Sequence, residues 1–433
     1  MRYTPIDPGL FKSNRERFMR SMRPHSIAIF HSNDLMPRNG DSFFPFRQNS
    51  DLFYLSGLDQ EETVVVLFPD CVKEGFREVA FIKKTDAFIK RWEGQKYTKE
   101  EARAVSGIQK VFWLDDMDTI LHELILLSRR IYLNLPEQDR LIPEFPSRDM
   151  RFARQLQERY PAHKYHRAQP QLKKQAMIKS GPEVSLIKQA IDITDSAFRR
   201  VLRFVRPGVT EYEIEAEVTH EFLSRRATGH AYAPIIAGGE NSCVLHYVQN
   251  NQVCKEGDVL LMDFGAEYAN YAADLSRTIP VDGTFSPRQR AVYDAVLRVL
   301  RYARNLLVPG TLIEDYNRAV GLKMEEELLQ LGLLDKSDIK NQDKNYPAYK
   351  KYFMHGVSHH LGLDVHDRSD RYGPIQAGMV FTCEPGIYIP EEKLGIRLEN
   401  NILVTDQDPV DLMAHVPIEA EEVESLMKSA ERV

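Results

Sequence analysis

The chain has 433 residues, of which 43% are hydrophobic, and a formal net charge of −6 at pH 7. This length predicts two or three domains with sizeable cores. The mild acidity, with no dominant lysine or arginine stripe, argues against nucleic acid or an anionic membrane as the main partner. No segment approaches the ~20 consecutive apolar residues of a membrane span, and the charged N-terminus does not resemble a signal peptide. We therefore expect a cytoplasmic protein whose four cysteines, none in a C-x-x-C spacing, are free thiols.

Residues 1–170 are expected to form an α/β domain, because β-rich runs alternate there with polar, helix-like stretches. The predicted strands lie at residues 26–30, 63–68, 78–83 and 130–133, and predicted helices lie at residues 98–105 and 147–159. Within this domain, residues 46–57 mix polar and aromatic side chains, and that pattern alone favours a structural strand followed by a loop. Pro170 and a cluster of lysines then interrupt the pattern, so residues 171–433 are expected to form a second domain.

The second domain is expected to open each of its two halves with a pair of helices. Ser180 and Glu183 form a capping box, which is typical of a helix start, and an apolar face follows. Ser286 and Gln289 repeat this device in the second half, with Pro287 at the first helical position. These helices are expected to cover one face of a sheet and to leave the other face for polar side chains.

Two strand-like segments of the second domain share one pattern. Residues 257–265 read GDVLLMDFG and residues 378–386 read GMVFTCEPG, so an acid stands at the seventh position of each. These acids are Asp263 and Glu384, and each follows a short apolar run of the kind that forms a buried strand. The repeat predicts a pseudo-symmetric sheet.

Each half also supplies a second acid after the chain turns back. Asp274 follows Asp263 by eleven residues, and Glu399 closes the segment GIRLE at residues 395–399. Two carboxylates on neighbouring antiparallel strands cost several kcal/mol unless a cation or a set of donors compensates them. The four acids therefore require either a metal or a shared proton.

Between the halves, residues 355–366 hold four histidines within twelve residues, namely His355, His359, His360 and His366. Imidazole suits first-row transition metals and carboxylates suit harder divalent ions. Four carboxylates, one or more imidazoles and no thiolate therefore predict a site for two divalent metals about 3.5 to 4 Å apart.

Taken together, these motifs resemble the pita-bread metallopeptidase family, and within it the aminopeptidase P (Xaa-Pro aminopeptidase) branch. The segments that carry the resemblance are residues 46–51, 54–57, 263–265, 274–278, 355–359, 362–367, 384–386 and 395–399. The resemblance implies an N-terminal α/β domain followed by a pseudo-two-fold pita-bread (α+β) catalytic domain. It also implies an enzyme that hydrolyses the N-terminal Xaa-Pro bond of peptides through a metal-bridging hydroxide.

The resemblance implies a ligand set for two Mn²⁺ ions. Asp263 and Asp274 would bind one metal and His359 the other, while Asp274, Glu384 and Glu399 complete or bridge the two shells. In this comparison Glu384 also acts as the general base that takes the proton of the hydroxide. Without the resemblance, any of the clustered histidines could be the ligand.

Further residues receive roles from the same resemblance. His355 and His366 would hold the peptide carbonyl and the developing oxyanion, and His246 would contact the substrate. Arg397 would orient Glu399, which lies two residues further along the same strand face. His360, where close relatives often have a large aromatic, is expected to be a packing or surface residue. The aromatics Tyr232 and Tyr388 suit a pocket wall and a core position equally.

Two alternatives share parts of this pattern. A prolidase, which cleaves only Xaa-Pro dipeptides, uses the same metal residues, and a non-catalytic binding module uses the same fold after losing ligands. The expected partners are peptides with proline at the second position, with no nucleic acid and no membrane. The resemblance also implies a homodimer or homotetramer.

Asn400 and Asn401 replace the two acids expected after Glu399, which puts the shape of the pocket in doubt.

Overall fold

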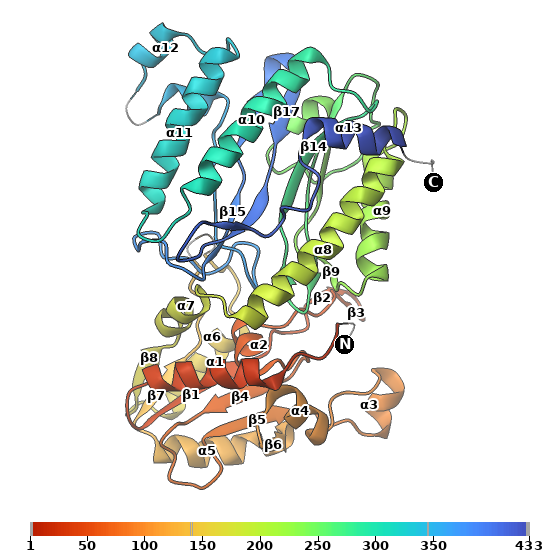
Figure 1. The fold of residues 1–433 in the computed structure, drawn as a ribbon. Coiled ribbons are helices and arrows are strands. Elements are labelled where there is room, and N and C mark those ends of the chain that lie inside the picture. Colours follow the sequence, from red (N-terminus) through yellow and green to blue (C-terminus); the bar gives the residue numbers. More distant parts are fainter. Residues whose placement is uncertain (1–2, 139, 141, 344–345, 430–433) are drawn as a thin grey trace. The chain divides into compact units, whose positions relative to one another are not determined.

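A computed structural model describes residues 3–138, 140, 142–343 and 346–429 (Figure 1). The chain divides into two compact units, one spanning residues 3–176 and the other beginning at residue 177. None of the helices in the described residues is long and apolar enough to cross a membrane.

The first unit is built on a six-stranded mixed sheet with the strand order β6-β5-β4-β1-β7-β8. Its strands are β1 (Ser26–His31), β4 (Val64–Leu67), β5 (Glu78–Ile82), β6 (Lys110–Trp113), β7 (Arg130–Leu133) and β8 (Lys164–Arg167), and a small hairpin is formed by β2 (Pro37–Asn39) and β3 (Ser42–Phe43). β4 pairs antiparallel with both of its neighbours, and the other pairs are parallel. All six residues of β1 are buried, as expected for a central strand covered on both faces.

Helices cover both faces of this sheet. The helices of this unit are α1 (Pro8–Ser21), α2 (Ser50–Ser56), α3 (Ala87–Trp92), α4 (Lys99–Ser106), α5 (Met117–Leu127), α6 (Arg148–Arg159) and α7 (Gln169–Ala176), with a 3-10 turn η1 at Leu114–Asp116. Leu124 of α5 and Leu156 of α6 pack with Ile29 on one face. Phe18 of α1 meets Phe30 edge-on at 5.5 Å on the other. The predicted α/β class of this domain is therefore confirmed, as are its predicted strands and helices.

The expectation of a strand and loop at residues 46–57 is wrong, because residues 50–56 form helix α2. The side chain of Asn49 accepts hydrogen bonds from the backbone N–H groups of Asp51 and Leu52, which caps the helix start. Gly57 ends it with a left-handed φ of 67°. Six of the seven residues of the helix are buried, and only Ser50 is not. The helix therefore has no exposed polar face, and its sequence lacks the period of an amphipathic helix.

The second unit has two halves that share a helix pair followed by a strand, a hairpin and a second strand. The first half comprises α8 (Gly181–Phe204), α9 (Glu211–Ser224), β9 (Gly229–His230), β10 (Ile235–Gly238), η2 (Gly239–Cys243), β11 (Val259–Phe264), β12 (Ala266–Tyr268), β13 (Tyr271–Ala272) and β14 (Leu275–Pro280). The second half comprises α10 (Pro287–Asn305), α11 (Ile313–Gln330), α12 (Lys336–Lys340), η3 (Ala348–Lys351), β15 (Val380–Cys383), β16 (Gly386–Ile389), η4 (Pro390–Glu392), β17 (Leu394–Arg397), β18 (Asn400–Leu403), β19 (Val410–Asp411) and α13 (Ala420–Ser429).

The helix pairs α8–α9 and α10–α11 flank strands β14, β15 and β17 within this unit (Figure 1). The predicted capping boxes are present at the starts of α8 and α10. Val296 of α10 and Met324 of α11 belong to an apolar core that also contains Phe381 of β15 and Ile396 of β17. The helices thus cover the outer face of the strands, as predicted, and the pseudo-two-fold class is confirmed.

A shared device places the acids in the two halves. In each half an acid lies within one residue of the end of a strand, a short hairpin follows, and a second acid directly precedes the next strand. β11, the β12–β13 hairpin and β14 form this unit in the first half, while β15, the β16–β17 hairpin and β18 form it in the second. β11 pairs antiparallel with β14, and β15 pairs antiparallel with β18. Antiparallel pairing brings both ends of each hairpin together, so both acids of a half lie at the same place.

Candidate metal centre

The first pair of acids lies where the chain passes from β11 into the β12–β13 hairpin and returns into β14. Asp263 lies opposite Ser276 in the antiparallel register, and Asp274 lies one residue before β14 begins. Gly265 makes this possible, because a Cβ atom there would lie 1.8 Å from the carbonyl oxygen of Ala273. The missing side chain lets the two backbones approach closely enough to set both carboxylates side by side.

Tyr232 joins these two acids. Its hydroxyl lies 2.5 Å from Oδ1 of Asp263 and 2.5 Å from Oδ1 of Asp274. Burial raises the pKa of Tyr232 well above its usual value, and the two carboxylates add to that rise, so the hydroxyl keeps its proton and acts as a donor. The sequence left Tyr232 open between pocket and core, and nothing in the sequence revealed its position between the carboxylates.

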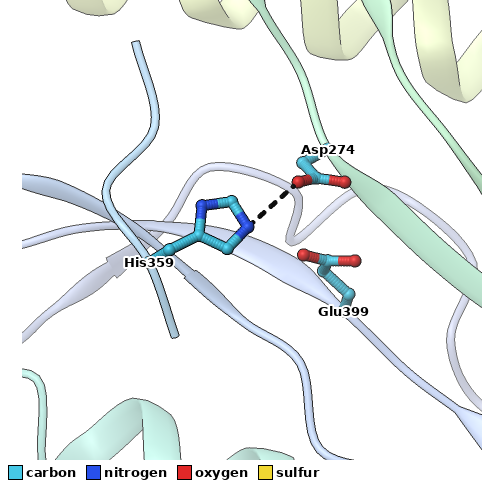
Figure 2. Close-up of side chains that lie close together, drawn as sticks. All are labelled: Asp274, His359 and Glu399. Carbon is cyan, nitrogen blue, oxygen red and sulfur yellow. Dashed lines mark ion pairs between the residues drawn. The ribbon is translucent and has the colours of Figure 1, made fainter. Parts of the chain in front are cut away.

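The second half contributes an imidazole and two more acids. Nε2 of His359 lies 3.4 Å from Oδ2 of Asp274 and 3.5 Å from Oε1 of Glu384. Candidate ligand atoms of Asp274, His359 and Glu399 all lie within 4.8 Å of one another (Figure 2). Nδ1 of His359 lies 3.0 Å from the carbonyl oxygen of His360, which can only accept. Nδ1 is therefore the donor to that carbonyl, and Nε2 faces the acids, which raise the pKa of His359 by favouring its protonated form. Once deprotonated, Nε2 presents its lone pair to the acids, as a metal ligand requires.

Glu399 carries the clearest sign that a cation belongs here. Ser276 Oγ donates to Oε2 of Glu399 over 2.8 Å, and Arg277 Nη1 donates to the Glu399 carbonyl oxygen over 2.7 Å. The other carboxylate oxygen, Oε1, is buried and has no hydrogen-bond partner among the described residues. An unpaired buried carboxylate oxygen is costly, and a bound cation would satisfy it.

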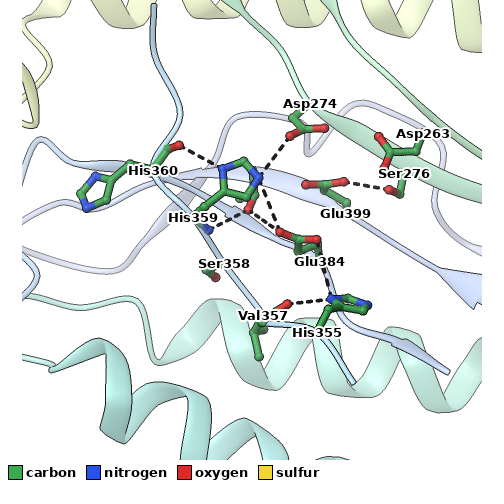
Figure 3. Close-up of polar contacts among 12 residues, drawn as sticks. Asp263, Asp274, Ser276, His355, Val357, Ser358, His359, His360, Glu384 and Glu399 are labelled. Atoms are coloured by element: carbon green, nitrogen blue, oxygen red, sulfur yellow. Dashed lines mark hydrogen bonds and ion pairs between the residues drawn. The ribbon is translucent and has the colours of Figure 1, made fainter. Parts of the chain in front are cut away.

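The pKa values of the acids also indicate a cation site. Burial raises the pKa of Glu384 to about 7, with Asp274 adding to the rise and His359 opposing it. Burial and the neighbouring acids also raise the pKa values of Asp274 and Glu399. These shifts mean that the acids repel one another and lack enough cationic neighbours. Four carboxylates and one imidazole converging on a buried point therefore fit the two predicted divalent metals (Figure 3).

Arg397 lies beside this cluster but not in the way predicted. β17 ends at Arg397, and Glu399 occupies the short link before β18, so the two residues do not share a strand face. The chain leaves one hairpin there and enters a different sheet, which interrupts the strand. Arg397 instead donates to Oδ2 of Asp263 at 2.7 Å and to Oγ of Ser276 at 2.9 Å. Ser276 in turn donates to Glu399, so the contact between Arg397 and Glu399 is indirect.

His355 is a neutral imidazole with both nitrogens engaged. Nδ1 lies 2.7 Å from the carbonyl oxygen of Gly356, and Nε2 lies 2.8 Å from the hydroxyl of Tyr388. Burial and, to a lesser extent, the nearby Arg397 guanidinium lower the pKa of His355 to about 4. Nδ1 therefore donates to the carbonyl, and Nε2 accepts from Tyr388. The predicted hydrogen bond to a peptide carbonyl would require one of these two contacts to be exchanged.

The remaining predicted histidines differ in exposure. His366 is exposed, and its ring lies 4.2 Å from that of His359 in an edge-on arrangement. His246 is exposed and is near enough to His355 to lower the pKa of that residue. His360 is buried and its ring lies 4.2 Å from the ring of Phe381, which confirms the predicted packing role.

Comparison with known proteins identifies the class. Residues 185–406 match the model of metallopeptidase family M24, and residues 11–132 match the aminopeptidase P N-terminal domain. The chain belongs to metallopeptidase family M24, which confirms the resemblance seen in its motifs.

The similarity extends over almost the whole chain. It is 34% identical to an Xaa-Pro aminopeptidase of Haemophilus influenzae, with 96% of each chain covered, and 33% identical to one of Escherichia coli, with 98% of each covered. Among solved structures, aminopeptidase PepP of Pseudomonas aeruginosa matches with a TM-score of 0.89 at 31% identity, covering 98% of this chain and 99% of that one. The low-pH form of Escherichia coli aminopeptidase P matches with a TM-score of 0.90 at 31% identity, covering 99% and 100%.

Proposed function

We propose that this chain is a metal-dependent aminopeptidase that hydrolyses the peptide bond between an N-terminal residue and a following proline. The observation that carries the proposal is the convergence of Asp263, Asp274, His359, Glu384 and Glu399 on one buried point, with a Glu399 oxygen left unpaired. Full-length similarity to Xaa-Pro aminopeptidases supports the choice of substrate.

The five residues would hold two divalent cations, with Asp263 and Asp274 on one and His359, Glu384 and Glu399 completing the pair. When bound, such cations lower the pKa of water and polarise a carbonyl, which is the chemistry that peptide hydrolysis needs. A donor set rich in carboxylate oxygen, with one imidazole, favours Mn²⁺ over softer metals. A zinc-substituted Escherichia coli aminopeptidase P with product is among the structural neighbours, with a TM-score of 0.88, so Zn²⁺ belongs in the test.

The other residues supply substrate contacts and proton transfer. Glu384 lies with Oε1 3.5 Å from His359 and Oε2 3.9 Å from His355, and we assign to it the proton from the attacking water. His246, His355 and His366 would contact the peptide near the scissile carbonyl. Arg397, through its contact with Asp263, would fix the orientation of that carboxylate.

A metal series with matched peptides tests this function. The purified protein is stripped with EDTA, supplied with Mn²⁺, Zn²⁺ or Co²⁺, and given an Xaa-Pro dipeptide, an Xaa-Pro-Xaa tripeptide and a longer peptide. We expect cleavage of the tripeptide and longer peptide, greatest with Mn²⁺, and loss of cleavage in EDTA. Cleavage of the dipeptide alone would identify a prolidase, and full activity in EDTA would contradict a metal enzyme.

Matched variants separate the site from general charge effects. Asp274→Asn removes a charge from the cluster, so we expect activity and metal content to fall together. Asp282→Asn removes the same charge from an exposed position just after β14 and is expected to leave both unchanged.

A catalytically silent protein that still binds metal and Xaa-Pro peptides would indicate a binding module instead.

The proposal also covers the oligomeric state and the cellular location of the protein. The homodimer or homotetramer stays a prediction, which light scattering of the purified protein would test. All four cysteines are free thiols, three of them buried, which supports the cytoplasmic location that we propose.

A further inference from the structure

Buried and exposed side chains alternate along the loop that carries His246. Along residues 243–248 the odd-numbered side chains are buried or half-buried and the even-numbered ones, including His246, are exposed. Tyr247 is 7% exposed and belongs to a small apolar cluster with Tyr388, the residue whose hydroxyl contacts His355. The placement of Tyr247 therefore decides where the neighbouring His246 lies.

A completely buried carboxylate organises this loop. Glu211, the first residue of α9, has 0% exposure and accepts four hydrogen bonds. Its Oε1 accepts from the backbone N–H of Gly238 at 2.9 Å and from Asn241 Nδ2 at 3.3 Å. Its Oε2 accepts from the Tyr247 hydroxyl at 2.7 Å and from the backbone N–H of Gln252 at 2.9 Å. One side chain thus ties the beginning, the middle and the end of the loop to a helix.

We propose that Glu211 is a positioning residue that holds His246 for contact with the peptide substrate. The inference rests on the proposed function, which assigns the substrate contact to His246. The loop has a second anchor, because Ser242 Oγ accepts from the backbone N–H of Gly395 at 2.8 Å, in the strand that ends at Arg397. None of the four hydrogen bonds that Glu211 accepts from the described residues comes from the metal centre, so it acts through the loop.

The role requires a carboxylate rather than an amide. Each oxygen of Glu211 faces one backbone N–H, from Gly238 on one side and from Gln252 on the other. A glutamine has one oxygen and one NH₂ group, so in either orientation its NH₂ group faces a backbone N–H. Neither of these two donors can be reversed, unlike the Tyr247 hydroxyl or the Asn241 amide. Glu211→Gln therefore leaves a buried donor unsatisfied and loosens the loop.

A double-mutant cycle tests the inference. KM and kcat for an Xaa-Pro-Xaa tripeptide are measured for the metal-loaded wild type, E211Q, H246A and the double variant, together with metal content and thermal stability. We expect E211Q to raise KM roughly tenfold, as one unsatisfied buried donor implies. We expect kcat and metal content to change little. If Glu211 acts through His246, the double variant matches H246A, because residues that act as one unit are not additive.

A matched control comes from the same helix turn. Glu213 is exposed, and its carboxylate accepts from the Thr210 backbone N–H in the capping box, a role that glutamine also fills, as Gln289 does in α10. E213Q changes the charge near the same helix terminus and is expected to leave KM unchanged. If E211Q fails to fold, Y247F replaces it, since this variant removes only one of the four donors and is expected to raise KM by a smaller factor.

Each contrary outcome has a defined meaning. An unchanged KM in E211Q, or additive effects of E211Q and H246A, overturns the positioning role. If the wild type cleaves no Xaa-Pro peptide with any metal, the proposed function fails by itself. Hydrogen exchange of residues 239–250 then decides the structural part of the inference. Faster exchange in E211Q than in E213Q supports it, and equal exchange overturns it.

Discussion

Tyr232 shows how one side chain can connect acids that the sequence presents separately. A hydroxyl has one proton, so it can donate to Asp263 or to Asp274 at one moment but not to both. Both contacts are nevertheless 2.5 Å. The second contact is favourable only if that carboxylate is protonated or a cation draws both carboxylates together. Burial and the neighbouring Asp263 raise the pKa of Asp274. In the metal-free protein, this raised pKa favours the protonated carboxyl group and so reduces the negative charge of the cluster.

The acids give the metal-free protein an unusual dependence on pH. Burial raises the pKa of Glu384 in the folded protein from its ordinary value of 4.5 to about 7. The folded state then binds more protons than the unfolded state between these two values, so its stability falls as pH rises through this window. The raised pKa values of Asp274 and Glu399 act in the same direction, and together the acids outweigh the opposite effect of His355, whose pKa is lowered to about 4. In EDTA we expect the free energy of unfolding to decrease by about 1 to 3 kcal/mol between pH 5 and pH 7.5.

Denaturation in urea at a series of pH values measures this effect, and Glu384→Gln provides the comparison. The glutamine has no proton to lose, so the decline should become shallower. Saturating metal should reverse the trend, because metal competes with protons for the same ligands and binds better as pH rises. Stability that increases with pH in EDTA would contradict the arrangement of acids described for the folded protein.

Among the elements, the loop that follows His359 depends on one buried ion pair. The Asp367 backbone N–H donates to the His360 carbonyl at 3.0 Å, which closes the loop. Asp367 Oδ2 lies 2.6 Å from Lys179 Nζ, and their side chains are only 2% and 1% exposed. The loop fits around this pair so closely that a Cβ atom on Gly362 would lie 2.2 Å from Asp367 Oδ2. The pair therefore connects the residue before the N-cap of α8 to the loop that carries His366.

Removal of the lysine tests this connection. Lys179→Met leaves a buried carboxylate without its main partner, and breaking such a pair costs about 3 to 5 kcal/mol. We expect this loss in the free energy of unfolding, measured by urea denaturation. Adding Asp367→Asn removes the uncompensated charge and should restore part of the loss. Lys188→Met, at an exposed position of α8, is the control, and an equal effect there would show that the buried pair has no special role.

The elements of this fold differ in how visibly the sequence encodes them. The starts of α8 and α10 follow from local hydrogen bonds within four residues, and the repeated strand pattern places Asp263 and Glu384. The sequence predicts a strand where helix α2 forms, because burial on all sides removes its helical period. It does not predict β6 and β8, because two of the four residues in β8 are exposed and only Val111 of β6 is buried, so neither forms an apolar run.

The residues of the candidate metal centre also differ in whether the sequence predicts them. The four acids and His359 could be predicted, because spacing in a repeat and resemblance to a family both point to them. Tyr232 and Ser276 could not, since each gains its role from partners 31 to 123 positions away in the chain. Such contacts depend on the antiparallel register of β11 with β14 and on the return of the second half, which no local pattern specifies. For the same reason the sequence predicts one strand face for Arg397 and Glu399, where the structure has the link between β17 and β18.

On the scale of the whole molecule, the two units have separate cores. The apolar cluster around Ile29 and Leu124 lies entirely within residues 3–176, and the cluster around Val296 and Phe381 lies entirely in the second unit. All five candidate ligands also belong to the second unit. Metal binding should therefore stabilise one unit directly and leave the other unaffected.

Hydrogen exchange with mass spectrometry resolves this prediction along the chain. At a hundredfold excess of metal over its dissociation constant, binding adds about 2.7 kcal/mol to any opening reaction that releases the metal. Backbone amides of residues 259–280 and 380–403 should then exchange about a hundredfold more slowly than in EDTA. Peptides from residues 3–176 should exchange at the same rate in both conditions. In Asp274→Asn the metal response of the second unit should shrink, because one ligand to the cation is weakened. Protection of both units together would mean that they open as one cooperative body, so that the metal stabilises the first unit through the second.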